Sequence, residues 1–390
     1  MKPVVLVLSR YFLPGYLAGG PVRSIAGICE SLQNDFQWKV LTVNCDARCA
    51  EPYVGIVSDC WTRVDGVDVW YVSRGQGGIK TLLNIIRCTP HDLIYLNSFF
   101  DQKYSIAPVL LFWLRLISPA PVLLAPRGEF SAGALKIKSH KKRFYLWLAK
   151  LFDLYGDVAW HASTKLEADE ILAALPVVAE RVHVASNLSP AKNAAPPRLA
   201  GKANSLRVCF LSRISRKKNL DYALKVMALV TVPITFSIFG PTEDPEYWQE
   251  CKVLIAGLPG NVVVEYRGAV KSADVPGVLA AHDLFFLPTH GENFGHVFVE
   301  AWSAGLPVLT SDQTPWRGLT EKQIGWDLPL DDAAGFAKAV DLVSGWSDEV
   351  YQIWSRKAQA EAAKILDDPQ AVAANRKMFM SVIKRGAENG

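Results

Sequence analysis

Two glutamates, Glu292 and Glu300, form the pattern Glu-x7-Glu, the first in a predicted turn and the second in the predicted helix that follows it. Residues 289–295 are mainly polar and include two glycines, which predicts a turn, and residues 296–304 follow a helical pattern that a glycine and a proline end. Because helix side chains lean toward the helix N-terminus, we expect Glu300 to point toward the loop that holds Glu292. Carboxylates accept hydrogen bonds from hydroxyl groups, so the hydroxyls of a sugar are the expected partners.

The start of the same helix offers hydrogen-bond donors. The amides of Phe294, Gly295 and His296 lie where a helix begins, and such amides lack acceptors within the helix and attract anions. Acids that bind hydroxyls, next to a helix start that binds anions, predict a pocket for a sugar attached to a phosphate.

A basic loop follows an apolar run at residues 206–211, which predicts a buried strand. The loop places Arg213, Arg216, Lys217 and Lys218 within six positions. Ligands of α/β sheets bind beyond the ends of strands, and the four positive charges favour an anion there. A solvated basic surface is the alternative interpretation, and we prefer it for Arg216 and Lys217.

The elements that must position these residues follow from hydrophobic periodicity. Apolar runs alternate with amphipathic stretches in both halves of the chain, as in strand–helix units on mostly parallel sheets. A chain of 390 residues exceeds what one core usually fills, so we expect two domains, residues 1–190 and 206–368. Residues 191–205 lack an apolar rhythm and are the predicted linker, and residues 369–390 form a separate final segment.

Composition excludes several classes of protein. The formal net charge of +4 is too small to indicate a nucleic acid partner. The apolar run 4–8 is too short for a signal peptide, and the run 106–117 contains Arg115 and is too short for a bilayer, so it predicts a core helix. Seven cysteines without a Cys-x-x-Cys pair predict reduced thiols in a cytoplasmic protein.

A cluster of positive charges precedes an aromatic segment at residues 144–152. The cluster consists of Lys136, Lys138, Lys141, Lys142 and Arg143. One interpretation is contact with an anionic membrane surface, where each cation contributes about 1 kcal/mol. The other is a solvated helix start whose apolar face packs on its own domain, and the sequence leaves both open.

The acidic motif contains Phe-Gly and is followed by Ala-Gly-Leu-Pro-Val. Together with segments 239–244, 287–289 and 311–316, it resembles the signature of the retaining family-four (group 1) glycosyltransferases, particularly their bacterial polysaccharide-building branch. The resemblance is strong over residues 206–330. It implies the α/β GT-B fold, in which two Rossmann-like domains face each other across a central cleft. The first domain would take the acceptor and the second the nucleotide sugar, and the helix at 369–390 would return to the first domain.

The resemblance also assigns roles to residues. Arg213 and Lys218 fall on the positions of an arginine and a lysine that hold the diphosphate of a sugar nucleotide, so they are the candidate catalytic cations. Glu292, grouped with them, would bind hydroxyls of the transferred sugar, and Glu300 would bind the ribose. The other candidates for donor binding are Phe294, Gly295, His296, Gly240 and the pair Gly19 and Gly20, which resembles the glycine-rich loop of the family.

The first domain departs from the family pattern. Many relatives carry a histidine near the donor sugar, whereas this chain has Pro-Arg-Gly-Glu at residues 126–129. Arg127 and Glu129 are therefore candidates for positioning the sugar or the acceptor. His161, after a further predicted strand, is a lesser candidate, and a buried histidine with satisfied hydrogen bonds is the preferred interpretation there.

The implied enzyme transfers a sugar from a nucleoside diphosphate sugar to a glycan, expected to be lipid-linked, with retained anomeric configuration and without a metal or other cofactor. The expected role is surface polysaccharide synthesis (O-antigen, capsule or exopolysaccharide), in the cytoplasm or on the inner face of the membrane. Two alternatives stay open: a glycoside hydrolase that uses the paired carboxylates, and a catalytically silent partner that binds sugar nucleotides in a polysaccharide assembly complex. An oxidoreductase is disfavoured because the first loop lacks Gly-x-Gly-x-x-Gly.

Overall fold

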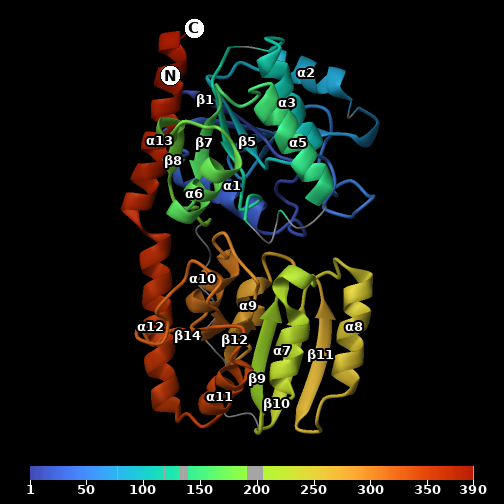
Figure 1. Cartoon of the computed structure of the whole chain (residues 1–390), viewed down its shortest axis with the longest axis vertical. Helices are drawn as coiled ribbons and strands as arrows, with labels where there is room; N and C mark the ends of the chain where they lie inside the picture. The colour runs from blue at the N-terminus through green and yellow to red at the C-terminus, as the bar shows by residue number, and fades with distance from the viewer. Residues whose placement is uncertain (77, 118, 132–134, 136–138, 191–204, 390) are drawn as a thin grey trace. The chain divides into compact units, whose positions relative to one another are not determined.

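The computed structural model describes residues 1–76, 78–117, 119–131, 135, 139–190 and 205–389 (Figure 1). The chain forms two compact units, Met1–Ala191 with Asp368–Gly390, and Lys192–Asp367. The final helix α13 (Pro369–Asn389) thus belongs to the first unit. Most of the predicted linker lies outside the described residues.

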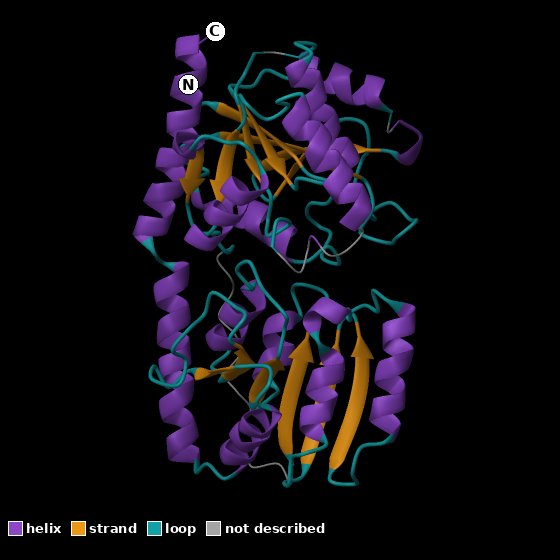
Figure 2. Ribbon diagram, in the orientation of Figure 1, coloured by secondary structure: helices purple, strands orange, loops and turns teal. Residues whose placement is uncertain are grey.

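The first unit contains an eight-stranded sheet in the order β3-β4-β2-β1-β5-β6-β7-β8. Neighbouring strands are parallel except for the edge pair β3 and β4. The central strands are apolar along their length because helices cover both faces of the sheet (Figure 2). The strands are β1 (Val4–Leu8), β2 (Gln37–Val43), β3 (Trp61–Val64), β4 (Val67–Val72), β5 (Leu93–Asn97), β6 (Val122–Ala125), β7 (Ala159–Ala162) and β8 (Val182–Val184).

Two apolar cores lie on the opposite faces of this sheet. Leu6 and Leu8 of β1 pack into the core that includes α2, α3, α5 and α6, whereas Val5 and Val7 pack into the core that includes α1 and α13. This alternation follows from the two-residue period of a strand. The helices are α1 (Gly20–Ser31), α2 (Ile79–Cys88), α3 (Ala107–Trp113), α5 (Ser139–Leu151) and α6 (Lys165–Ala174).

The second unit contains a six-stranded parallel sheet in the order β11-β10-β9-β12-β13-β14. The strand order reverses between β9 and β12, so the carboxyl ends of these two strands form the switch point at which open α/β sheets bind ligands. The strands are β9 (Leu206–Leu211), β10 (Ile234–Phe239), β11 (Val262–Gly268), β12 (Leu284–Leu287), β13 (Val308–Ser311) and β14 (Gly325–Leu328). The helices are α7 (Leu220–Met227), α8 (Pro245–Ala256), α9 (Val275–Ala280), α10 (His296–Ser303), α11 (Ala333–Ser344) and α12 (Asp348–Leu366).

One predicted element is only partly correct. The run 106–117 forms the short helix α3, but Trp113 and Leu114 near its end are 46% and 53% exposed, so this segment is not wholly a core helix. Among the described residues, none of the helices combines the length and the apolar character needed to cross a membrane.

Candidate active site

The loops after β9 and β12 meet at the switch point of the second unit. The basic turn η4 (Arg216–Lys218) follows β9, and the predicted acidic loop follows β12. The Asn219 side chain donates to the Pro288 carbonyl at 2.9 Å, and the His290 amide donates to the Lys217 carbonyl at 2.9 Å. These bonds hold the basic turn against the acidic loop.

Lys218 and Glu292 form an ion pair across this contact, and their side chains are only 13% and 11% exposed. The Thr289 hydroxyl lies 3.3 Å from the Glu292 carboxylate. Burial raises the pKa of the Glu292 carboxyl, but the charges of Lys218 and Lys217 and the hydrogen bonds from Lys218 and Thr289 outweigh burial, so the pKa lies below its ordinary value. Glu292 is therefore an ionised acceptor for hydroxyl groups, next to an ammonium group that a phosphate can bind.

Arg213, also in the loop after β9, pairs with Glu243 in the loop after β10, and its Nη1 lies 3.1 Å from Oε1 of Glu243. The two side chains are 40% and 29% exposed, so the guanidinium is accessible to a ligand. Sequence reasoning did not identify Glu243, although the resemblance covers its segment. The structure thus places Arg213 and Lys218 in one loop and gives each of them an acidic partner.

Gly240 has a structural reason to be glycine. Its φ of +138° is rare for residues with a side chain, and a Cβ atom there would lie 1.8 Å from the Ser212 carbonyl oxygen. The glycine lets the loops after β9 and β10 approach each other. Its predicted contact with the donor stays a prediction.

The start of α10 is fixed by aromatic packing. Gly295 precedes the helix with a φ of +77°, which favours glycine. The Phe294 ring is buried, and its centroid lies 5.2 Å from that of the Trp316 ring. The Trp316 indole donates to the Phe294 carbonyl at 2.5 Å. The His296 ring lies 4.8 Å from that of Phe294. Glu300 follows one turn later and is half-buried, and its orientation toward the acidic loop stays a prediction.

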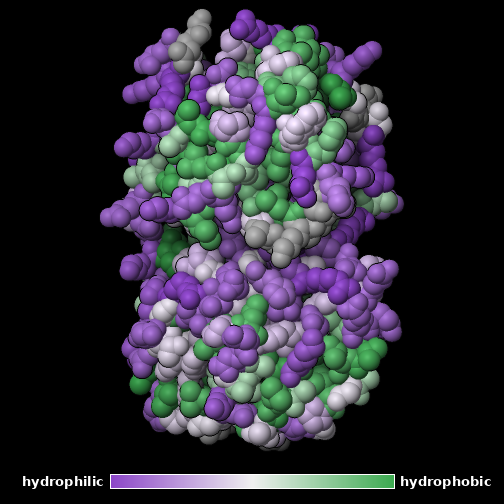
Figure 3. Space-filling model, viewed as in Figure 1, coloured by the Kyte–Doolittle hydropathy of each residue, from purple (hydrophilic) through white to green (hydrophobic). Residues whose placement is uncertain are grey.

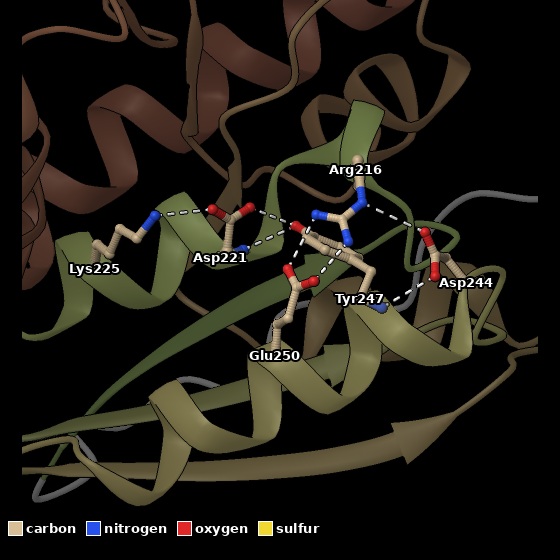
Figure 4. A network of polar contacts seen from close by, with 6 residues as sticks. All are labelled: Arg216, Asp221, Lys225, Asp244, Tyr247 and Glu250. Atoms are coloured by element: carbon tan, nitrogen blue, oxygen red, sulfur yellow. Dashed lines mark hydrogen bonds and ion pairs between the residues drawn. The ribbon is translucent and has the colours of Figure 1, made fainter. Parts of the chain in front are cut away.

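A second network fastens the basic turn to α8 (Figure 4). The Arg216 guanidinium donates to Glu250 at 2.6 Å, lies 3.6 Å from Asp244 and sits over the Tyr247 ring, 5.1 Å from its centroid. The Tyr247 hydroxyl in turn donates to Asp221 at 2.6 Å. Arg216 thus helps to fix the turn that carries Lys218. No local sequence pattern predicted its partners Asp244 and Glu250, because they lie about thirty residues further along the chain.

In the first unit, Arg127 and His161 belong to one buried chain of hydrogen bonds. The Arg127 guanidinium donates to Asn97 and to the Tyr95 hydroxyl, each at 2.7 Å, and it also bonds Asn187. The Tyr95 hydroxyl lies 2.7 Å from Nδ1 of His161, whose Nε2 donates to a backbone carbonyl. Burial, assisted by the Arg127 charge, lowers the pKa of His161 to about 3. His161 is therefore neutral, with both ring nitrogens bonded.

Glu129 is held by the loop after β5. The amides of Phe99 and Phe100 donate to its carboxylate at 2.5 and 3.0 Å, and the Ser98 hydroxyl donates at 2.9 Å. Burial nevertheless raises its pKa above the ordinary value. A further buried acid that sequence reasoning missed, Glu167, accepts from the Gly128 amide at 2.6 Å and so helps to shape the same turn.

The glycine pair of the first unit begins α1. Gly19 adopts a φ of +74°, and its amide donates to the Tyr16 carbonyl at 3.1 Å. A Cβ atom at Gly20 would meet no other atom within 4 Å. Packing does not require glycine at Gly20, whereas its open surroundings would let a ligand approach the backbone, so the predicted role stays a prediction.

The basic segment is only partly described, because Lys136 and Lys138 lie outside the described residues. Lys141, Lys142 and Arg143 lie in the first turn of α5. In the next turns, Phe144 and Trp147 are 61% and 55% exposed and stack on each other at 5.9 Å. Figure 3 shows apolar side chains on the surface where Figure 1 places α3 and α5. Membrane contact stays a prediction.

Comparisons with known proteins show which families and folds the chain is similar to. Residues 205–344 match the family Glycosyl transferases group 1, and this region includes Arg213, Lys218, Glu292 and Glu300. An uncharacterised 41.2 kDa protein in the cps region of Klebsiella pneumoniae is 30% identical over 27% of the chain, and a phosphatidyl-myo-inositol mannosyltransferase of Mycobacterium leprae is 29% identical over 32%. The matched regions span 28% and 33% of those relatives, about a third of their length or less.

Solved structures match nearly the whole chain. Anabaena Alr3699/HepE in complex with UDP and glucose has a TM-score of 0.71 at 17% identity, and the match covers 98% of this chain and 100% of that one. WaaG, a glycosyltransferase involved in lipopolysaccharide biosynthesis, has a TM-score of 0.64 at 14% identity, covering 97% and 99%. The predicted fold class is confirmed: the chain shares the GT-B fold of these solved glycosyltransferases, and its residues 205–344 match the family Glycosyl transferases group 1.

Proposed function

We propose that this chain is a retaining glycosyltransferase that moves a sugar from a nucleoside diphosphate sugar to a glycan acceptor in surface polysaccharide or glycolipid synthesis. The Lys218–Glu292 pair carries the proposal, because it joins the loops after β9 and β12 at the switch point of the sheet. The UDP and glucose in the Anabaena complex and the mannosyltransferase of Mycobacterium leprae support a sugar-nucleotide donor and a glycolipid product.

The reaction breaks the bond between the anomeric carbon of the sugar and an oxygen of the diphosphate, which keeps the electron pair. The oxygen of an acceptor hydroxyl forms the new bond to the anomeric carbon, and the proton of that hydroxyl goes to the departing diphosphate. Arg213 would bind two phosphate oxygens at once, whereas Lys218 would supply a point charge. Each such donor changes the rate by about 10²–10³-fold if it stabilises the departing oxygen.

The acids would bind the sugars on either side of the diphosphate. Glu292 would accept hydrogen bonds from the transferred sugar, and Glu300 from the ribose, each contributing about 1.5–3 kcal/mol. An ammonium group has three donors, so Lys218 can keep Glu292 as one partner and bind a phosphate oxygen as another. The ion pair would then orient both groups before the donor arrives.

The proposal includes a lipid-linked acceptor, no metal ion and a position on the inner face of the cytoplasmic membrane. The cations of the loop after β9 support a reaction in which protein side chains neutralise the diphosphate. The exposed Phe144 and Trp147, in the same helix as Lys141 and Arg143, support contact with an anionic lipid surface.

A binding screen tests the proposal. Thermal shift with UDP, GDP and ADP and with their sugar conjugates should find one nucleotide that stabilises the protein. Arg213→Ala should abolish that shift, whereas Lys322→Ala should retain it, because Lys322 pairs with Glu361 at 2.7 Å and precedes β14, at the other end of the sheet. Release of free sugar from a neutral glycoside, without any nucleotide binding, would instead identify a glycoside hydrolase. Nucleotide-sugar binding without transfer to any glycan acceptor would favour the silent partner.

A further inference from the structure

The first unit contains a cavity of about 1360 Å³ that the reaction described above does not use. Its walls come from residues that follow β1, β2, β4, β5 and β6, so it lies at the carboxyl edge of the first sheet. Ligands of open α/β sheets bind at this edge. The volume exceeds the roughly 300–1,000 Å³ of most small-molecule pockets, which favours an extended ligand.

The charged lining of the cavity is mainly positive. Among the residues that the structure describes, six cationic side chains line it against three carboxylates, an excess of three positive charges. The cations are Arg10, Arg48, Arg74, Lys103, Lys141 and Lys142. Such an excess inside a concave surface attracts anions.

The three carboxylates accept hydrogen bonds from backbone amides that belong to the cavity walls. Asp46 accepts from the amides of Tyr16 and Leu17 at 2.8 and 3.1 Å. Asp101 accepts from the amides of Lys103 and Tyr104 in η2 (Gln102–Ile106), at 3.0 and 2.7 Å, and Glu129 accepts from the loop after β5. The acids therefore shape the cavity, because each of them accepts hydrogen bonds from backbone amides of its walls.

Several cations have weak or neutral partners. Arg10 lies 3.9 Å from Asp101 and is 62% exposed, and Arg74 donates to the Cys49 carbonyl at 3.0 Å. The Lys103 ammonium lies 5.0 Å from the Tyr104 ring. Burial and the Arg10 charge lower the pKa of Lys103, while Asp101 opposes them. A bound anion would favour the charged form of Lys103 and so raise this pKa again.

Aromatic rings share the cavity with these cations. Tyr11, Phe100, Tyr104 and Tyr145 all line it, and flat aromatic rings suit the faces of sugar rings or an unsaturated hydrocarbon chain. The helix α5 contributes Lys141, Lys142 and Tyr145 to the cavity and carries the exposed Phe144 and Trp147. One helix therefore serves both the cavity and the apolar surface.

We propose that this cavity binds a diphosphate group of the acceptor, with Arg10, Arg74 and Lys103 as its main ligands. The inference rests on the proposed function and on the expectation, from the family resemblance, that the first domain takes the acceptor. A diphosphate attached to a lipid and a diphosphate without one share this chemistry, so the experiment must separate them.

The test measures binding of farnesyl diphosphate, inorganic pyrophosphate and farnesol by titration calorimetry, with the donor site saturated by the nucleotide that the thermal-shift screen identifies. Farnesyl diphosphate should bind, and Arg10→Gln, Arg74→Gln and Lys103→Gln should each weaken it about tenfold or more. Lys165→Gln is the matched control, because Lys165 is an exposed cation of the same unit that does not line the cavity. It should leave the affinity unchanged.

The three probes separate the outcomes. Equal binding of pyrophosphate would support the diphosphate site but assign it to a ligand without a lipid. Equal binding of farnesol, or affinities that the three glutamine variants do not change, would overturn the inference. If nucleotide binding depends on Arg213 but the three cavity variants bind farnesyl diphosphate as the wild type does, only this inference is removed. The proposed function then stays intact. Absence of nucleotide binding would remove the proposed function, and the diphosphate titrations would still report on the cavity.

Discussion

Replacing Lys218 with methionine should lower the free energy of unfolding, because it breaks the ion pair that joins the two loops. The substitution keeps most of the side-chain volume and removes the charge, so the Glu292 carboxylate, 11% exposed, loses its nearest cation. Breaking a buried pair from one side costs 3–5 kcal/mol. Because Lys217 and Thr289 remain near Glu292, we expect a smaller loss in the free energy of unfolding, about 2 kcal/mol.

In the Lys218→Met protein, the contribution of Glu292 to stability should depend on pH in the opposite direction from the wild type. In the wild type, the lowered pKa of Glu292 contributes stability that is present above its ordinary pKa and is lost as pH falls through the folded value. Without Lys218, burial becomes the main influence and should raise that pKa. The Lys218→Met protein should then gain stability relative to the wild type as pH falls from 7 toward 4.5, because protonation removes the buried charge.

Urea unfolding, followed by tryptophan fluorescence at pH 7 and pH 4.5, measures both effects. Lys322→Met is the control, because its ion pair with Glu361 is more exposed and should contribute little. The double variant Lys218→Met/Glu292→Gln should recover most of the lost stability without recovering turnover. If the double variant loses as much as the two single variants combined, the two side chains are not coupled and the reasoning is wrong.

Four further predictions address the reaction and its setting. Arg213→Ala should lower kcat by about 10²–10³-fold and barely change the unfolding free energy, because its ion pair is exposed; steady-state kinetics and urea unfolding measure the two. Glu300→Gln should mainly raise KM for the donor, by about tenfold, and an unchanged KM would remove it from the donor site. Activity should survive a chelator, and a loss that magnesium or manganese restores would contradict the metal-free mechanism. Phe144→Ser with Trp147→Ser should reduce sedimentation with anionic vesicles, and equal sedimentation would exclude this surface as the membrane contact.

The sequence was informative wherever local patterns decide the structure. The apolar run of β12, the polar turn after it and the glycine that stops α10 predicted where these elements begin and end. The resemblance, carried by residues 206–330, predicted the fold that the solved structures share. In both cases the evidence lies in consecutive residues, so no knowledge of distant neighbours was needed.

Contacts between distant segments were not predictable in the same way. Lys218 and Glu292 were assigned to different parts of a ligand, yet they form an ion pair with each other although 74 positions separate them. Arg216, interpreted as a solvated charge, is indeed 58% exposed, but its surface ion pair with Glu250 of α8, which strand order brings beside it, was not predicted. Such pairs depend on which strands are neighbours and on how far each loop extends. Neither can be predicted from one short segment of the sequence.

The membership of α13 in the first unit has a consequence for the order of folding during synthesis. Met378, Phe379 and Val382 are buried in the core that Val5 and Val7 also enter, so this core stays incomplete until residue 382 has left the ribosome. The second unit, Lys192–Asp367, is continuous and can fold earlier. A nascent chain would thus complete its later half first, and losing the last twenty or so residues would damage the half that was made first.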